Sequence, residues 1–471
     1  MGDFASHMAL TGESIIARLE DAPLTSWQIK LRLVVGTATF FNAFEVLAIA
    51  YALPELRAQW HLTQAQSGFL LSALFVGEII GALLFGMIAE TRGRRAALIG
   101  CTALYSAMSL AASLAPNYHW LVAARLLTGI GLGAEVPIAV TYISEIAKAQ
   151  GRGRFVLLYE LVFPLGLLAG ALLGWWFILH FGWRPFLAIG ALPAVLVLPM
   201  MIRFVPESPR WLVHRGRLSE ADAIVRRIEA ASAGSTTPGS TLWNTTEARV
   251  TDLPGKSNDK PIFPFSFAIL SGLFSQGYGR RTAMLWTMYF CCFFMNYGLV
   301  TWLPTLYHGL FHLSLSDSLR NAMITQAAGF SGTLTTALAI DLVGRRIWFS
   351  TAFLLAAAAF FNLGVNGLES ANHMLVGGCI SFYFVSAISI GMILYAPELY
   401  PTRMRVIGVS LGYAVSILAG IVAPMAVGLI VDTAGLGMIF AIFACLGALA
   451  GAICLIFAVE TRNRSLELIS P

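Results

Sequence analysis

Five ionisable residues stand inside long apolar runs of this sequence, and they are the side chains whose chemistry most needs an explanation. They are Glu45, Glu78, Arg125, Glu135 and Glu160. An ionisable side chain within an apolar segment is costly unless it is paired or hydrated, so such residues often mark ion or proton pathways. An acid in such a place can gain and lose a proton, and this proton exchange is the chemistry we consider first. For Glu78, Glu135 and Glu160, a neutral, hydrogen-bonded structural role is an equal alternative.

The second half of the chain has no ionisable residue at comparable depth, but it carries aromatic and amide side chains in its apolar runs. Each of them taken alone is more often a packing residue than a ligand contact. As a set they favour a small aromatic or heteroaromatic ligand over a polyol, because a ring can stack on such side chains. We assign the substrate site to Asn42, Glu135, Tyr289, Asn296, Tyr297, Gln326, Tyr383 and Tyr395.

Twelve apolar runs must position these residues. Each is about as long as the ~20 residues that a helix needs to cross a ~30 Å hydrocarbon core. The composition agrees, with 57% hydrophobic and 12% charged residues among 471 and a mean hydropathy of +0.75. We predict an all-α membrane protein whose spans cover residues 31–53, 66–89, 97–115, 120–147, 155–179, 185–204, 283–307, 320–342, 347–368, 373–399, 406–431 and 437–459.

Polar segments divide the chain into five parts. We expect a cytoplasmic N-terminal segment at 1–30, a six-helix half at 31–204, a cytoplasmic linker at 205–282, a second six-helix half at 283–460 and a tail at 461–471. Within the linker, 219–231 reads as a short amphipathic helix with Ser219 as its N-cap.

Basic residues are concentrated in alternate loops, such as the loop with Arg92, Arg94 and Arg95. Positive charge stays on the cytoplasmic side, so we predict a multi-pass protein of the inner (plasma) membrane with both termini in the cytoplasm. This asymmetry explains the net charge of +5 without a nucleic-acid partner. The six cysteines lie in predicted spans and suggest neither disulfides nor a metal site. There is no cleavable signal peptide pattern, and we expect a monomer without cofactors.

Three short motifs recur after corresponding apolar runs of the two halves, 251 to 253 residues apart. They are Gly93-Arg94-Arg95 with Gly344-Arg345-Arg346, Tyr142-x-x-Glu145 with Tyr395-x-x-Glu398, and Glu207 with Glu460. The recurrence indicates a duplicated six-helix unit, as in one well-known transporter architecture.

Charged residues that repeat at helix ends can pair in one conformation and separate in another, which would make a gate. The alternative is that the arginines only follow the distribution of positive charge. We assign the cytoplasmic gate to Glu90, Arg94, Arg95, Glu145, Arg154, Glu207, Arg345, Arg346, Glu398, Arg405 and Glu460.

The same motifs resemble those of the major facilitator superfamily. Five segments are similar to the sugar-porter, organic-ion and synaptic-vesicle-protein branches of this superfamily. They are 86–95, Arg125 to Gly133, Pro206 to Trp211, Pro397 to Thr402 and Glu460 to Arg462. The resemblance covers essentially the whole chain and implies twelve transmembrane helices in two six-helix halves.

Within the superfamily, segments 133–137, 158–160 and 297–304 are similar to bacterial nicotinate transporters and aromatic-acid symporters. The seventh span lacks the Gln-Gln-x-Ser-Gly signature of sugar porters, which disfavours a hexose. Seven residues before a proline of the eleventh span, organic-anion and nicotinate relatives have an Arg and organic-cation relatives have an Asp. This chain has Ile417 at that position, seven residues before Pro424, so the resemblance does not indicate the charge of the substrate.

The resemblance also implies a partner for Glu45. The stretch from Phe41 to Glu45 resembles the first-helix motif that carries the coupling acid in proton-linked relatives, and in this fold the fourth span, with Arg125, faces the first. We therefore predict a proton-coupling group of Glu45, Arg125, Glu135 and Glu160. The alternative is a permanent Glu45–Arg125 bridge that only positions helices.

Together these observations predict a proton-coupled symporter of a small organic metabolite, most specifically an aromatic or heteroaromatic carboxylate such as nicotinate. The proton gradient would supply the energy, and the partners would be the substrate, protons and the lipid bilayer. The alternatives are an organic-cation/proton antiporter and a membrane receptor without transport. An enzyme is disfavoured, since the sequence has no nucleophile–base pair, phosphate loop or metal cluster.

Overall fold

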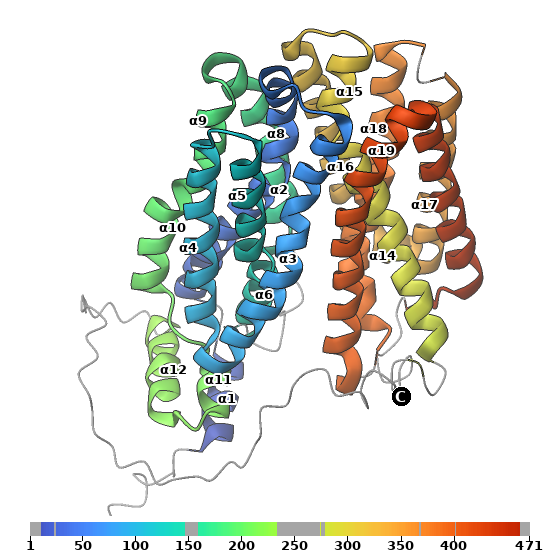
Figure 1. Ribbon diagram of the computed structural model, residues 1–471. Coiled ribbons are helices and arrows are strands. Elements are labelled where there is room, and N and C mark those ends of the chain that lie inside the picture. The colour runs from blue at the N-terminus through green and yellow to red at the C-terminus, as the bar shows by residue number, and fades with distance from the viewer. Residues whose placement is uncertain are drawn as a thin grey trace, which may run out of the picture.

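The computed structural model describes residues 11–22, 25–146, 159–232, 274, 278–366, 369–400 and 402–461. Within these ranges the regular structure is helical. Figure 1 shows two upright bundles side by side, one built from α2 to α10 and the other from α14 to α19. A layer of short helices lies below the first bundle. We call this end of the molecule the linker end and the opposite end the far end.

The first bundle holds the six spans of the N-terminal half. Capping boxes begin two of its helices, with Thr25 and Thr63 each accepting from the backbone of a glutamine three residues on. Its elements are α2 (Ser26–Trp60), α3 (Gln64–Arg92), α4 (Arg94–Ser113), α5 (Tyr118–Leu132), α6 (Glu135–Ile146), α8 (Val162–Phe181), α9 (Trp183–Ala188), η1 (Ile189–Ala191) and α10 (Leu192–Phe204).

The second bundle repeats this order. Gly93 and Gly344 occupy equivalent turns between the second and third helices of each half, with φ of 104° and 95°. These positive values favour glycine. The elements are α14 (Tyr278–Val300), α15 (Leu303–Leu310), α16 (Leu315–Val343), α17 (Arg345–Asn366), α18 (Ala371–Glu398) and α19 (Thr402–Phe457).

The helices account for twelve crossings. Ten helical segments of the described residues are long and apolar enough to span a membrane. One of them, Ile407–Phe457, contains a turn at Gly435 (φ 78°) and therefore supplies two crossings. The twelfth is α16, which has a similar length but carries polar residues such as Asn321 and Gln326 in its first half. The predicted all-α fold with twelve transmembrane helices is confirmed.

Two predicted spans differ in detail from the structure. The fourth, predicted at 120–147, is found as the span Tyr118–Ile146, with a break between α5 and α6 where Pro137 has no N–H to donate to the carbonyl of Gly133. The seventh, predicted to reach 307, ends at Val300, and Pro304 in the first turn of α15 begins a new helix. Residues 147–158, which include the start of the predicted fifth span, lie outside the described ranges.

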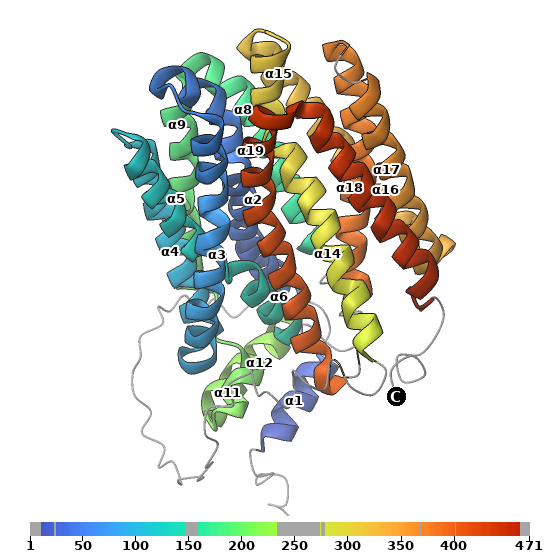
Figure 2. The ribbon, with the colours of Figure 1, turned by 45° about the vertical axis from the view of Figure 1, so that its right-hand side comes forward.

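The layer at the linker end consists of α1 (Gly12–Asp21), α11 (Pro209–His214) and α12 (Leu218–Ser232). In Figure 2 these helices lie beneath the N-terminal half. Ile15 and Leu19 of α1 pack against apolar residues of α11 and α12. The prediction placed no helix at 12–21, and Ser219 lies inside α12 rather than capping it.

The two halves contact each other towards the far end, through α3 with α19, α8 with α16, and α2 with α15. The Ser72 hydroxyl of α3 donates to the carbonyl of Ile421 of α19 over 2.7 Å. Helices α3 and α19 approach so closely that a Cβ added to Gly68 would lie 2.8 Å from the Pro424 oxygen. The far end is closed in this conformation.

Candidate functional site

Glu45 and Arg125 form a buried ion pair between α2 and α5. Arg125 Nη1 lies 2.7 Å from Glu45 Oε2, and its Nη2 donates to the Glu45 backbone carbonyl over 2.8 Å. Ser109 of α4 donates to Glu45 Oε1 over 2.5 Å. Both residues are 1% exposed. The carboxylate and guanidinium pair with each other away from water, which makes the two buried charges tolerable. Arg125 Nε is buried without a hydrogen-bond partner in the described part of the chain.

Glu135 begins α6 at the interruption of the fourth span, and it is fully buried. Its two carboxylate oxygens accept from the Thr39 hydroxyl over 2.9 Å and the Asn42 amide over 3.0 Å. The Thr39 hydroxyl also has a short hydrogen bond with the phenol of Tyr159. Polar neighbours on α2 therefore hold this acid in place. Glu78 of α3 is buried too, within electrostatic reach of Arg125.

A cavity of about 130 Å³ lies between the two halves. Its polar lining includes Glu160, Asn296, Tyr297, Gln326 and Tyr413, and phenylalanine rings form much of the rest. Ligand pockets commonly measure about 300–1,000 Å³, so in this conformation the cavity is smaller than that range and has room only for a very small molecule. Among the described residues that line it, Glu160 is the one with a formal charge.

Helical spacing explains how the cavity is built. Residues at i, i+3, i+4 and i+7 share one face of a helix. The face of α14 that meets the cavity carries Phe293, Asn296, Tyr297 and Val300, and that of α16 carries Gln326, Gly329, Phe330 and Thr333. The sequence prediction found the amides and Tyr297 but missed the apolar members. The same spacing around Asn296 and Gln326 would have found them.

Five residues predicted to bind substrate lie outside the cavity lining. Asn42 and Glu135 bind each other, as described above. Tyr289 stacks on Phe293 and packs behind it, against Gly412. Tyr383 donates to the Thr335 hydroxyl over 2.9 Å, and Tyr395 bonds to the backbone of Val459 at the linker end. In this conformation these five side chains make structural contacts.

The predicted gate residues of the N-terminal half gather around the turn at Gly93. Glu207 accepts from the backbone N–H groups of Arg94 and Arg95, and so caps α4. Burial raises the pKa of Glu207, and the backbone donors oppose that rise. Arg94 pairs with Glu145 over 3.4 Å and with Glu90 over 3.1 Å.

The C-terminal half repeats this arrangement. Glu460 accepts from the backbone N–H groups of Arg345 and Arg346, and Arg345 pairs with Glu398 over 3.1 Å. Each charged pair therefore lies within one half in this conformation. Among the predicted gate residues, Arg154 and the side chain of Arg405 lie outside the described part of the structure.

The chain matches the family model described as "Sugar (and other) transporter" over residues 33–471. It belongs to this family. Its relatives include the niacin transporter NiaP of Acinetobacter baylyi, which is 32% identical over 97% of this chain and 99% of its own length. Organic cation/carnitine transporter 7 of Arabidopsis thaliana is 29% identical over 86% of each chain. The gallate transporter of Pseudomonas putida is 27% identical over 96% of each.

Among solved structures, the chain is similar to the xylose transporter XylE of E. coli in a partially occluded inward open conformation. The TM-score is 0.72 with 20% identity, over 94% of this chain and 100% of the other. This likeness supports the two-bundle fold. The protein is a multi-pass membrane transporter of the major facilitator superfamily, not an enzyme.

Proposed function

We propose that this transporter is a proton-coupled symporter of a small aromatic or heteroaromatic carboxylate, such as nicotinate. The observation that carries the proposal is the cavity between the halves, where aromatic rings surround one acid, Glu160. The names of the niacin and gallate relatives support this substrate class. The linker end would face the cytoplasm, the chain would act as a monomer in the inner membrane, and rocking of the halves would expose the cavity to each side in turn.

The chemistry of the cavity suggests how a proton and the substrate enter together. A carboxylate next to an ionised Glu160 would face repulsion in a site of low dielectric. If Glu160 carries a proton, it can instead donate a hydrogen bond to the substrate carboxylate. Arg125 does not line the cavity, because Glu45 holds its guanidinium. Glu160 would therefore link proton uptake to substrate binding, and the Glu45–Arg125 pair would respond behind it.

A second candidate function is proton-coupled transport of an organic cation. The same observation favours it, since an ionised Glu160 would attract a cation and no arginine is found among the described lining residues. The similarity to an organic cation/carnitine transporter also agrees with it.

The variant Glu160→Gln separates the two candidates in binding experiments on purified protein. For a carboxylate substrate, glutamine imitates the protonated acid, so nicotinate binding should persist and lose its dependence on pH. For a cation, the same change should abolish binding of an aromatic amine. Loss of nicotinate binding in Glu160→Gln, with the amine still bound by the native protein, would exclude the carboxylate proposal.

Proton coupling is tested by uptake into proteoliposomes with and without a proton gradient. Glu45→Gln should abolish accumulation against a concentration gradient and leave counterflow exchange measurable, because exchange needs no net proton movement. Accumulation by Glu45→Gln with normal dependence on pH would show that Glu45 is not the coupling acid.

A further inference from the structure

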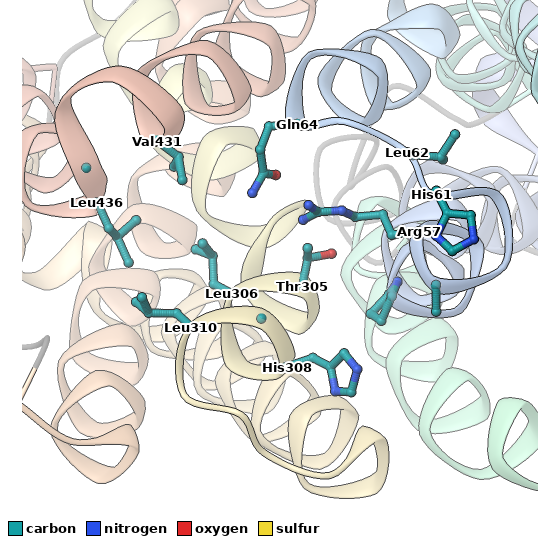
Figure 3. A pocket seen from close by; sticks show the side chains of 14 residues that line it. Arg57, His61, Leu62, Gln64, Thr305, Leu306, His308, Leu310, Val431 and Leu436 are labelled. Atoms are coloured by element: carbon teal, nitrogen blue, oxygen red, sulfur yellow. The ribbon is translucent and has the colours of Figure 1, made fainter.

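A second pocket opens at the far end, separate from the cavity between the halves. Its volume is about 620 Å³, within the usual range for small-molecule sites. Figure 3 shows the side chain of Arg57, from α2, reaching between Gln64 of α3 and Thr305 of α15. Leu306 and Val431 supply apolar wall on the other side. Both halves of the molecule therefore contribute to this pocket.

The polar side chains of this pocket have unused hydrogen-bonding capacity. Thr305 is only 5% exposed, yet its hydroxyl has no partner in the described part of the chain, and the same holds for the Gln64 side-chain oxygen. No hydrogen bond or ion pair joins Arg57 to another described residue. Asp432 of α19 acts on Arg57 electrostatically but is exposed and makes no ion pair with it. Buried polar groups left in this state usually indicate an absent partner.

We propose that this pocket binds a small carboxylate through Arg57, Gln64 and Thr305. The guanidinium offers a planar fork of donors suited to a carboxylate, while the Thr305 hydroxyl and the Gln64 amide nitrogen, but not its oxygen, offer further donors. The side chains of Leu306 and Val431 form an apolar surface against which the aromatic ring of the acid can pack. The choice of an aromatic acid as the ligand rests on the proposed function. The inference that the pocket binds an anion rests on Arg57, Gln64 and Thr305 alone.

The position of the pocket gives its ligand a conformational effect. Arg57 and Gln64 belong to the N-terminal half, and Thr305 and Val431 belong to the C-terminal half. Rocking that opens the far end would separate these walls. A carboxylate held between them would bind only the closed far end and would shift the population towards that conformation.

A cysteine at the rim of the pocket reports on its occupancy. Ala58 lines the pocket and is exposed. We would label Ala58→Cys with a maleimide in nanodiscs, where both ends are accessible, and subtract the labelling of the protein without this cysteine. Nicotinate and benzoate should slow the labelling, and the neutral analogue nicotinamide should not. Arg57→Gln should raise the half-protecting concentration roughly tenfold or more, as expected for the loss of hydrogen bonds to a charged group.

Two further variants separate this site from the cavity between the halves. Ser389→Trp would fill that cavity, and protection of Ala58→Cys by benzoate should persist in it. Asp432→Asn removes an acid that competes for Arg57, so protection should occur at lower benzoate concentration. Three results would each overturn the proposal. They are equal protection of Ala58→Cys with and without Arg57, loss of protection in Ser389→Trp, and protection by inorganic phosphate but by neither acid. If benzoate protects Ala58→Cys from labelling but nicotinate is not transported, the carboxylate pocket is supported and the proposed transport substrate is wrong.

Discussion

The two halves are closely alike at the linker end and different in their interiors. Tyr142 donates to the carbonyl of Pro206, and Tyr395 donates to the carbonyl of Val459, each over 3.0 Å. The capping glutamates and the glycine turns also correspond. In both halves these contacts fix the path of the chain where helices leave the bundle.

In the interiors, two charged residues of the N-terminal half have glycines at the corresponding positions of the C-terminal half. Arg125 precedes Tyr142 by 17 residues, and Gly378 precedes Tyr395 by the same number. Glu78 precedes Gly93 by 15 residues, as Gly329 precedes Gly344. Gly329 lines the cavity, whereas Arg125 and Glu78 are buried within their own half. Under the proposed function, this difference would give a division of labour, with proton chemistry in the N-terminal half and much of the ligand shape in the C-terminal half.

The largest effect should follow from breaking the ion pair in the N-terminal half. Arg125→Ala leaves the Glu45 carboxylate buried without its cation, which should cost about 3–5 kcal/mol of unfolding free energy. Gly378→Ala is the matched control, since the nearest atom to an added Cβ lies 3.9 Å away and little should change. Denaturant unfolding in detergent measures both.

The double variant Arg125→Ala with Glu45→Gln sharpens this test. It removes the unpaired charge and should recover part of the lost stability. If Arg125→Ala and Gly378→Ala are equally stable, the pair contributes nothing to the N-terminal half and the division of labour is unsupported.

A smaller effect should come from separating the halves at the far end. Gly68→Leu would force atoms against the Pro424 carbonyl, and overpacking of this kind costs about 1–3 kcal/mol. The strain is relieved if α3 and α19 move apart, so a cysteine at Thr305 should react faster with a maleimide. Gly86→Leu on the same helix is the control, because no atom lies within 4 Å of its added Cβ. Equal labelling rates in the two variants would contradict a closed far end.

The sequence predicted the twelve crossings and the duplicated linker-end motifs well, because long apolar runs and repeated Gly-Arg-Arg and Glu residues are local signals. It also pointed to both members of the Glu45–Arg125 pair. It did not predict that Tyr289 and Tyr383 would turn away from the cavity. The direction of a side chain depends on how each helix is rotated in its bundle. That rotation can be inferred only from a complete helix face, such as the residues from Phe293 to Val300 that meet the cavity, and not from single residues.

The pocket at the far end could not be read from the sequence for a different reason. Arg57 falls between the first two predicted spans, 31–53 and 66–89, and Thr305 falls inside the predicted seventh span, 283–307. Their proximity arises because the chain breaks between Val300 and Leu303 and turns α15 towards α2. Such breaks depend on tertiary packing as well as on Pro304.

The repeated tyrosines allow a finer comparison of the two halves. Tyr142→Phe removes one buried hydrogen bond and should cost about 1 kcal/mol. Tyr395→Phe should cost about twice as much, because the N–H of Val459 also donates to its hydroxyl over 2.9 Å, whereas Pro206 has no N–H to donate. Denaturant unfolding of the two variants provides the measurement. A larger loss in Tyr142→Phe would contradict this account of the linker end.

The smallest effect concerns the layer that α1 forms beneath the N-terminal half. Arg18 bonds to Glu229 over 2.6 Å and 2.8 Å, and this contact lowers the pKa of the Glu229 carboxyl below its ordinary value near 4.5. Because the pKa of Glu229 is lowered by folding, the contact stabilises the layer fully at pH values above the ordinary pKa. This stabilisation is lost as the pH falls through the lowered pKa of the folded protein. Arg18→Ala should therefore speed amide hydrogen exchange in α1 at pH 7, corresponding to a loss of about 1 kcal/mol of local stability, and the loss should be smaller at pH 3. The exposed Arg217–Glu220 pair at the start of α12 is the control, and Arg217→Ala should leave α1 unchanged at both pH values. Equal exchange in native protein and Arg18→Ala at pH 7 would mean that the apolar contacts of Ile15 and Leu19 alone hold α1 in place.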